Sequence, residues 1–441
     1  MTQSVQDMAT AARHAARRLA VTSTAQRNAA LEAMAMALEA RQEEILGANT
    51  LDVAEAQQAV SQGRMGQPLL KRLSLAGDKC AEMGRMVTSV AAQPDPLNVT
   101  QSATELSTAL ELYRVTVPIG VIGVIFESRP DALVQIAALG LKSGNAVLLK
   151  GGREAARTNQ VLGQVIVDAT TGSDGIPSGW LGLLASREDV GVLLGMDQDV
   201  DLIIPRGSNE FVRHILDNTR IPVMGHADGI CHVYVDRSAQ IGMATHIIVD
   251  AKTQYVAVCN AAETLLVHQD VAPALLARVV PELRSRGVVL RGDARARSLA
   301  PAAMDAATEA DWHTEYLDLI LAVKVVDDLD QAINHINEYG SHHTDTIVTE
   351  DRQAAEAFLR GVDSASVMHN ASTRFADGFR YGLGAEVGIS TSRLHSRGPV
   401  GLEGLTSYKY VLRGSGQCVG DFEGEQYRPY THRPLRKTWT A

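Results

Sequence analysis

Helical patterning dominates the first part of the chain. In LEAMAMALEARQEEIL (residues 31–46) apolar residues recur at helical spacing, while Glu and Arg occupy the opposite face. Nearly all of residues 1–95 follow this pattern. The sequence pattern then changes: the segment NVTQSATELSTALELYRVT (98–116) is rich in Thr and Val and has no helix signal. We therefore predict helices up to residue 95 and strands from 98 to 116.

After Pro118 the pattern alternates between short apolar runs and helical segments. GVIGVIFES, AVLLKGG, WLGLLA and DLIIP are uninterrupted apolar runs of the kind that buried parallel strands show. The segments between them are helical over about 10–15 residues, which indicates βαβ units and a parallel sheet. We expect a doubly wound, nucleotide-binding α/β domain over residues 117–236. The alternation restarts at residue 238, and it predicts a second α/β domain.

Composition narrows the class of protein. The chain has 441 residues, so two or three domains are expected. Its formal net charge of −10 argues against binding to nucleic acid through bulk electrostatics. Its four cysteines (Cys80, Cys231, Cys259, Cys418) show neither C-x-x-C nor metal spacing, which argues against a disulfide framework or zinc site. No apolar run approaches the roughly 20 residues of a membrane span. The N-terminus lacks the apolar core of a secretory signal. A surface helix is the preferred interpretation of this segment and a transit peptide the weaker one. We therefore expect a cytoplasmic protein.

Cys259 lies in the segment DAKTQYVAVCNAAETLLVH, between an expected helix and an expected strand. Polar residues precede it, and Asn260 and two alanines follow it. Small neighbours would let a substrate approach, and the Cys259 backbone N–H could stabilise an oxyanion. A lone cysteine is more often chemically inert, so the residue types alone leave both interpretations open.

Other motifs are weaker. In RGSNEF, Gly207 and Ser208 stand where a helix begins and could bind an anion, although an ordinary N-cap serine explains them as well. Lys150 ends the run VLLK at the edge of the sheet where ligands bind; a solvated lysine is the alternative. GLGAEVG (382–388) follows no apolar strand and is interpreted as a glycine-rich loop. His342 and His343 are neighbours in an expected loop, so their side chains should point apart, and no metal site is expected.

Taken together, several segments resemble the aldehyde dehydrogenase superfamily and, within it, the gamma-glutamyl phosphate reductase family. They are VPIGVIGVIFESRPDALVQIAALGLKSGNAVLLKGG, DLIIPRGSNEFVR, CNAAETLLVH, NEYGSHHTDTIVTED and GLGAEVGISTSRLHSRGPVGLEGLTSYKY. The resemblance covers nearly the whole chain. It implies an aldehyde-dehydrogenase-like fold with two doubly wound α/β domains and an oligomerisation hairpin.

The resemblance also implies a division of the chain. Residues 1–97 and 117–236 would form an NADP-binding Rossmann-like domain and residues 237–405 the catalytic domain. Residues 98–116 and 406–441 would be oligomerisation strands, in a dimer or tetramer.

The activity implied is the NADPH-dependent reduction of glutamyl 5-phosphate to glutamate 5-semialdehyde, the second step of proline biosynthesis. Cys259 would attack the acyl phosphate and form a thioester. Lys150 matches the family's cofactor lysine, Glu315 a glutamate that contacts the nicotinamide ribose, and Gly207 with Ser208 the phosphate-side loop.

The substrate's carboxylate needs a partner in this scheme. Arg397 in SRLHSRGPVG is the first candidate and Arg129 in FESRP, beside Ser128, the second, because a guanidinium can bind a carboxylate through two parallel hydrogen bonds. Both arginines could instead brace loops. The contact would then be sought at His343, Asn370 or Ser372.

Two positions depart from the family pattern. Oxidising aldehyde dehydrogenases carry a glutamate base in an E-L-G-G motif, whereas the matching stretch here, VMGHADGICHVYV (223–235), contains no glutamate. That base would activate water against the thioester, so its absence favours reduction. Tyr255 and Val256 stand where a proline is expected, which puts the local loop shape in doubt. An oxidising aldehyde dehydrogenase, a non-redox cysteine hydrolase and an inactive homologue remain the alternatives.

Overall fold

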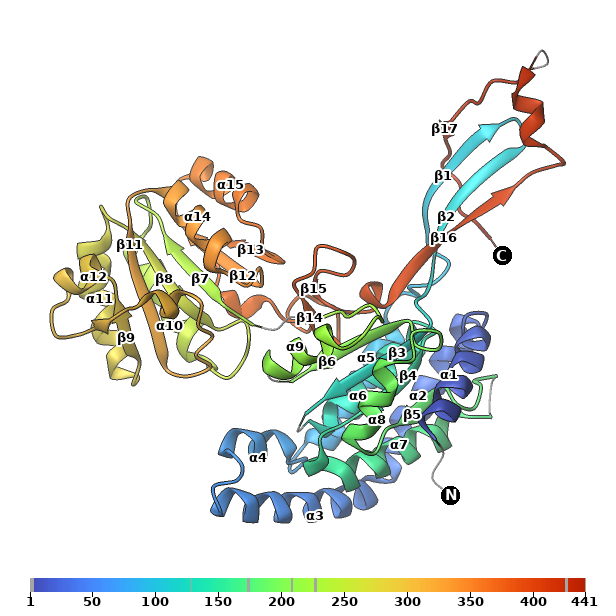
Figure 1. The fold of residues 1–441 in the computed structure, drawn as a ribbon, viewed down its shortest axis with the longest axis horizontal. Helices are drawn as coiled ribbons and strands as arrows, with labels where there is room; N and C mark the ends of the chain where they lie inside the picture. Colours follow the sequence, from blue (N-terminus) through green and yellow to red (C-terminus); the bar gives the residue numbers. More distant parts are fainter. Residues whose placement is uncertain are drawn as a thin grey trace.

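The computed structural model describes residues 4–127, 129–172, 175–207, 209–225, 228–424 and 427–440. Two α/β domains lie next to each other, and a β-sheet arm projects from the first of them (Figure 1). None of the described helices is both long and apolar enough to cross a membrane. The described helices are α1 (Val5–Leu19), α2 (Thr24–Ala40), α3 (Gln42–Ser61), α4 (Gln67–Leu73), α5 (Lys79–Ala92), α6 (Pro130–Lys142), α7 (Ala156–Thr170), α8 (Arg187–Leu194), α9 (Asn209–Asp217), α10 (Ile241–Thr253), α11 (Ala272–Ser285), α12 (Ala294–Leu299), α13 (Glu309–Trp312), α14 (Leu329–Tyr339) and α15 (Arg352–Gly361), with 3-10 turns η1 (Arg153–Ala155), η2 (Thr373–Phe375), η3 (Glu403–Leu405) and η4 (Val419–Phe422).

The strands fall into separate sheets. They are β1 (Thr100–Ser107), β2 (Leu110–Pro118), β3 (Val121–Phe126), β4 (Ala146–Lys150), β5 (Leu181–Leu183), β6 (Leu202–Arg206), β7 (Cys231–Val235), β8 (Ala262–His268), β9 (Val289–Gly292), β10 (Asp305–Ala306), β11 (Ile320–Val326), β12 (Thr344–Val348), β13 (Ser366–His369), β14 (Ile389–Ser390), β15 (Gly398–Pro399), β16 (Thr406–Arg413) and β17 (Arg433–Pro434). The helical N-terminal stretch, the strand pair after residue 98 and the α/β alternation are all confirmed.

The first domain has a parallel four-stranded sheet in the order β5-β4-β3-β6. The sequences of its strands are continuous apolar runs, because helices cover both faces of the sheet and side chains on each face are buried. Leu148 lies on the face covered by α1, since it shares with Met8 the space beside Gly182. Its neighbour Val147 points the other way, toward α6. Gly140 permits that contact, because a Cβ there would lie 2.6 Å from Val147 Cγ1.

The second domain has a seven-stranded sheet in the order β10-β9-β11-β8-β7-β12-β13, and all its strand pairs are parallel. β7 therefore belongs to this sheet and not to the first one. The change of sheet lies before Cys231, one strand earlier than the expected boundary at residue 236. Alternation of strands and helices does not reveal which sheet a strand joins, so the sequence pattern could not place β7.

The arm combines strands from distant parts of the chain. Its sheet has the order β16-β2-β1-β17, and β16 pairs with β2 from Thr406 opposite Pro118 to Arg413 opposite Glu111. Both strand-like stretches expected outside the α/β alternation therefore meet in one antiparallel sheet. The sheet stands away from both domains (Figure 1).

Asn145, fully buried in the turn between α6 and β4, joins the arm to the first domain. Its Oδ1 accepts a hydrogen bond from the Gly120 N–H (2.8 Å), just after β2, and its Nδ2 donates one to the Leu405 carbonyl (2.9 Å), just before β16. One amide thus holds both strands of the arm where they leave the domain.

We predict that Asn145→Ala lowers the free energy of unfolding by about 2–4 kcal/mol, because it leaves the half-buried Gly120 N–H and the buried Leu405 carbonyl without the side-chain partner they share. Urea denaturation followed by circular dichroism measures the change. Asn334→Ala, an exposed position on α14, is the control and should shift stability by less than about 0.5 kcal/mol. Equal, small effects of the two substitutions would contradict the role given to Asn145.

Candidate active site

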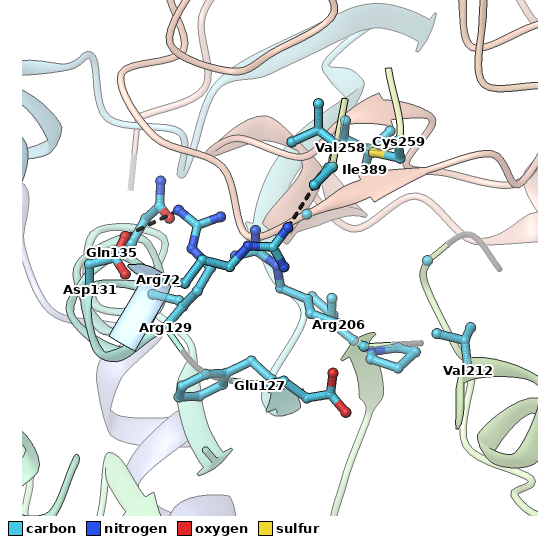
Figure 2. Close-up of a pocket in the computed structure, with 18 of the residues that line it drawn as sticks. Arg72, Glu127, Arg129, Asp131, Gln135, Arg206, Val212, Val258, Cys259 and Ile389 are labelled. Atoms are coloured by element: carbon cyan, nitrogen blue, oxygen red, sulfur yellow. Dashed lines mark hydrogen bonds and ion pairs between the residues drawn. The ribbon is translucent and has the colours of Figure 1, made fainter. Parts of the chain in front are cut away.

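A cavity of about 1100 Å³ opens between the two α/β domains. Its wall is built by α4, α5 and α6, the ends of β3 and β6, the loop that carries Cys259, and the segments around Glu315 and Gly388. Figure 2 shows Cys259 and Val258 on one side of this cavity, with Arg72, Arg129 and Arg206 reaching into the same space. The cavity lies at the carboxyl ends of β3 and β6, where parallel sheets bind ligands.

Cys259 is partly exposed in the loop between α10 and β8. A buried ion pair holds the two ends of this loop: Lys252 Nζ, at the end of α10, lies 2.6 Å from Glu263 Oε2, at the start of β8. Both side chains are fully buried. Burial raises the pKa of the Glu263 carboxyl and lowers that of the Lys252 ammonium, and the charge of each partner opposes both shifts.

The same carboxylate reaches a second loop. Glu263 Oε1 accepts a hydrogen bond from the Leu317 N–H (3.2 Å), two residues after Glu315. Glu315 lines the cavity, and its Oε2 accepts a hydrogen bond from Asn209 Nδ2 (3.1 Å). The Lys252–Glu263 pair thus fixes the loop of Cys259 and the loop of Glu315 relative to each other.

His343, the first residue before β12, lies directly behind the cysteine. Its Nε2 is 3.1 Å from Cys259 Sγ and its Nδ1 is 2.8 Å from Thr344 Oγ1. The ring is fully buried, so it contacts the sulfur from the protein side and does not line the cavity. A neutral imidazole at this distance can take the thiol proton, and this makes Cys259 a candidate nucleophile rather than an inert cysteine. His342 instead contacts the Asp363 carbonyl (2.6 Å), so the two neighbouring rings have different partners.

The stretch that lacks the glutamate base packs against Cys259. A Cβ at Gly229 would lie 2.2 Å from the Cys259 carbonyl oxygen, so only glycine fits there. Cys231 Sγ donates a hydrogen bond to the same carbonyl oxygen (3.2 Å). The backbone of Cys259 is therefore held by residues 229–231 while its side chain points to His343.

Arg72 and Arg206 are cavity residues that the motifs did not identify. Arg72, on α4, donates a hydrogen bond to the Ala257 carbonyl (2.7 Å), two residues before the cysteine. Arg206 is the last residue of β6, and its Nη1 is buried without a hydrogen-bond partner in the described part of the chain. Arg206 adjoins the anticipated RGS loop, which was a usable signal; nothing in the sequence links Arg72 to a loop 185 residues away.

The comparisons with known proteins agree with this geometry. A model of the aldehyde dehydrogenase family matches residues 1–319. The chain is 55% identical to the gamma-glutamyl phosphate reductase of Haloquadratum walsbyi over 443 aligned positions, which cover 99% of this chain and 96% of the relative. The chain belongs to the aldehyde dehydrogenase family and, within it, to the gamma-glutamyl phosphate reductases.

Further members of this family are similar over their whole length. The gamma-glutamyl phosphate reductase of Acetivibrio thermocellus is 53% identical, with 98% of this chain and 99% of the relative aligned. The crystal structure of the Thermotoga maritima gamma-glutamyl phosphate reductase superposes with a TM-score of 0.89 at 40% identity, covering 94% of this chain and all of that one. The aldehyde-dehydrogenase-like fold expected from the sequence is thereby confirmed.

The residues expected to hold the cofactor are only partly brought together. Gly207 and Glu315 both line the cavity. Lys150 ends β4 but does not line this cavity; it is buried, its Nζ donates to the Gly151 carbonyl (2.5 Å), and burial lowers its pKa. Ser208 lies outside the described residues. The aldehyde dehydrogenase family uses a nicotinamide cofactor, and a cavity lined by Gly207, where a Cβ would lie 3.0 Å from Phe211 Cδ1, and by Glu315 fits such a group.

The expected substrate residues separate into two groups. Arg129 lines the cavity, where its Nη2 lies 3.1 Å from Asp131. Arg397 does not: its Nη2 lies 2.9 Å from Asp363, outside the cavity, in the loop-bracing arrangement that was the alternative. Asn370 is also elsewhere, with Oδ1 accepting from the Thr349 N–H (3.0 Å) and Nδ2 donating to the Thr349 carbonyl (3.0 Å). Ser128 lies outside the described residues.

We predict that His343→Asn slows alkylation of Cys259 by iodoacetamide about tenfold at neutral pH and lowers kcat by about a hundredfold or more, because the thiol loses its base. The alkylation deficit should shrink as pH rises, since hydroxide then ionises the thiol without help. Mass spectrometry of the alkylated peptide gives the rate.

His342→Asn is the matched control, because Asn tolerates the positive φ of 60° at that position and the side chain faces Asp363. It should alkylate at the wild-type rate. The proton-acceptor role of His343 is wrong if both variants alkylate as fast as the wild type.

Proposed function

We propose that this chain catalyses the NADPH-dependent reduction of L-glutamyl 5-phosphate to L-glutamate 5-semialdehyde and phosphate, the second step of proline biosynthesis. The observation that carries the proposal is the Cys259 sulfur at the cavity, 3.1 Å from His343 Nε2 and facing a wall that includes Arg72, Arg129 and Arg206. A thiol with an adjacent base suits attack on an acyl phosphate, and the arginines suit an anionic substrate. The similarity to gamma-glutamyl phosphate reductases supports the same reaction.

The chain's own residues account for the acyl-transfer half of this reaction. His343 takes the thiol proton, and the Cys259 thiolate attacks the C5 carbonyl and forms a thioester as phosphate leaves. The Cys259 backbone N–H is the proposed donor to the oxyanion that develops during this attack. Arg129 is the proposed contact for the substrate's carboxylate. Arg397 and Asn370 are left out of this role because neither lines the cavity.

NADPH would be held by Lys150, Gly207, Ser208 and Glu315, and when bound it supplies the hydride that reduces the thioester to the aldehyde. Residues 223–235 contain no glutamate that could activate water against the thioester. Hydrolysis to a free acid is therefore not assisted at that position, which is why reduction is favoured over an oxidising aldehyde dehydrogenase. A cytoplasmic location fits four free cysteines, which reducing surroundings preserve.

The reverse reaction tests the function: phosphate-dependent reduction of NADP⁺ with glutamate 5-semialdehyde, followed by NADPH absorbance. We predict that Cys259→Ala reduces turnover to background, because no other cysteine of the described residues lines the cavity and could form the thioester, while NADPH binding by fluorescence stays nearly unchanged. The exposed Cys418→Ser serves as control and should retain most of the activity. More than a tenth of wild-type turnover in Cys259→Ala would refute the nucleophile.

We predict that Lys150→Ala weakens NADPH binding more than NADH binding, by about 1–3 kcal/mol, because a charge-assisted hydrogen bond to the 2′-phosphate is lost. Fluorescence titration with both cofactors gives the two Kd values. Lys409→Ala, exposed on β16 of the arm, should change neither. An equal loss for NADPH and NADH would make Lys150 a general ribose contact.

We also propose a homo-oligomer built through the arm, of at least two subunits. β16 is the outermost strand of the arm sheet and exposes Tyr408, Tyr410 and Leu412. An exposed apolar edge strand of this kind is a template for a partner strand.

Light scattering at micromolar concentration should give at least twice the 47.3 kDa mass of one chain. We expect the double substitution Tyr410→Lys, Leu412→Lys to shift the protein toward a monomer, because it places charge on the strand that pairs. Leu359→Lys, exposed on α15, should leave the mass unchanged. A wild-type mass of one chain would overturn the proposal.

A further inference from the structure

Arg206 differs from the other arginines of the cavity wall in its hydrogen-bond partners. It ends β6, and its stem passes Gly388, where a Cβ would lie 3.9 Å from its Cγ and Cδ. The other two arginines of the wall already have partners, since Arg129 pairs with Asp131 (3.1 Å) and Arg72 donates to the Ala257 carbonyl (2.7 Å). Nη1 of Arg206 is buried and has no hydrogen-bond partner among the described residues. Arg206 thus lines the cavity with a guanidinium of which one nitrogen has no acceptor among the described residues.

The charges around Arg206 do not neutralise it fully. Burial lowers its pKa, and the like charge of Arg129 lowers it further, while Glu386, Asp131 and Cys259 act in the opposite direction. Asp131 is shared with Arg129, and Glu386 Oε2 accepts from the Gly378 N–H (2.9 Å). A half-buried cation beside a second cation is unfavourable unless an anion completes the site. The cavity is therefore prepared for an anionic group at Arg206.

The proposed substrate has two anionic groups, and the position of Arg206 distinguishes them. Arg206, at the end of β6, and Cys259 line the same cavity (Figure 2), so a ligand that the sulfur attacks there also meets the guanidinium. The phosphate of an acyl phosphate is bonded to the carbonyl carbon that the sulfur attacks. The α-carboxylate lies at the far end of the carbon chain. The group beside both the sulfur and Arg206 is then the phosphate.

We propose that Arg206 binds the phosphate group that leaves when Cys259 attacks, an assignment that rests on the proposed function. In this step the S–C5 bond forms and the C5–O bond to phosphorus breaks, with its electron pair leaving on the phosphate oxygen. The proton that Cys259 loses is the one the phosphate gains, so a thiol and an acyl phosphate dianion give a thioester and HPO₄²⁻. A planar guanidinium can donate two parallel hydrogen bonds to such an oxyanion, which a lysine ammonium cannot.

The first experiment measures the charge beside the cysteine without using the enzyme's activity. Cys259 is alkylated with anionic iodoacetate and with neutral iodoacetamide, and the ratio of the two rates is compared between variants. Arg206→Gln should lower the iodoacetate to iodoacetamide ratio at least about threefold, while Arg206→Lys should keep it near the wild-type value. Inorganic phosphate should slow alkylation by iodoacetate in the wild type and not in Arg206→Gln.

The second experiment measures the reverse reaction. Arg206→Gln should raise the KM for inorganic phosphate about tenfold or more, with the KM for NADP⁺ and for glutamate 5-semialdehyde within about twofold of wild type. Arg206→Lys should raise the KM for phosphate by a smaller factor. Arg352→Gln, which removes an arginine that is 91% exposed on α15, is the matched control and should change none of these values.

The outcomes separate the two proposals. A raised KM for the semialdehyde with an unchanged KM for phosphate would place the carboxylate at Arg206 and overturn the assignment. Should Arg206→Gln fail to fold, wild-type protection by phosphate and the Arg206→Lys kinetics decide, and absence of protection overturns it. Lack of any turnover by the wild type with semialdehyde, NADP⁺ and phosphate would refute the proposed function, whereas the alkylation ratio would still show whether Arg206 attracts an anion to Cys259.

Discussion

The buried ion pair between Lys252 and Glu263 is the constraint on which the active-site geometry depends. It closes the loop of Cys259 at its base, and the same carboxylate also holds the Leu317 N–H. Two charges without solvent are costly to bury, and they are tolerated only when their geometry and remaining hydrogen bonds are good. The 2.6 Å contact and the second bond of Glu263 meet this condition. Glu315, which lines the cavity and is proposed to contact the cofactor, thereby keeps a defined distance from Cys259.

Three further segments hold the cysteine in place from other directions. His343 contacts its sulfur, Gly229 allows the chain to pass against its carbonyl, and Arg72 reaches across from α4 to the same loop. These contacts come from both α/β domains. The loop is therefore rigid at the nucleophile although it is irregular in backbone conformation. Tyr255 and Val256, where the resemblance led us to expect a proline, lie within a loop that these contacts already restrain.

The sequence pattern predicted the parts of this structure that depend on local periodicity. Continuous apolar runs such as Val121–Phe126 identified the buried strands, and the polar residues before Cys259 identified a reachable cysteine. Pattern alone could not assign the strand from Cys231 to the second sheet, because sheet membership is decided by tertiary pairing. It did not identify Arg72, because the contact of Arg72 with Ala257 joins residues 185 positions apart. It placed His343 among the substrate candidates, whereas the structure shows its buried ring against the Cys259 sulfur, a contact between residues 84 positions apart. Arg397 was the first candidate for the carboxylate, but its Nη2 pairs with Asp363 outside the cavity.

The pairing of β16 with β2 has a consequence for synthesis of the chain. The first domain takes its sheet and covering helices from residues before β7, but its core also includes Ala385, Val387, Val400, Leu402 and Leu405 from near the end of the chain. The arm also depends on late residues, because β16 begins at Thr406 and β17 at Arg433. A nascent or truncated chain would therefore lack part of the first domain's core and leave one edge of β2 unpaired. The N-terminal half of the chain completes its fold only after translation has passed Pro434.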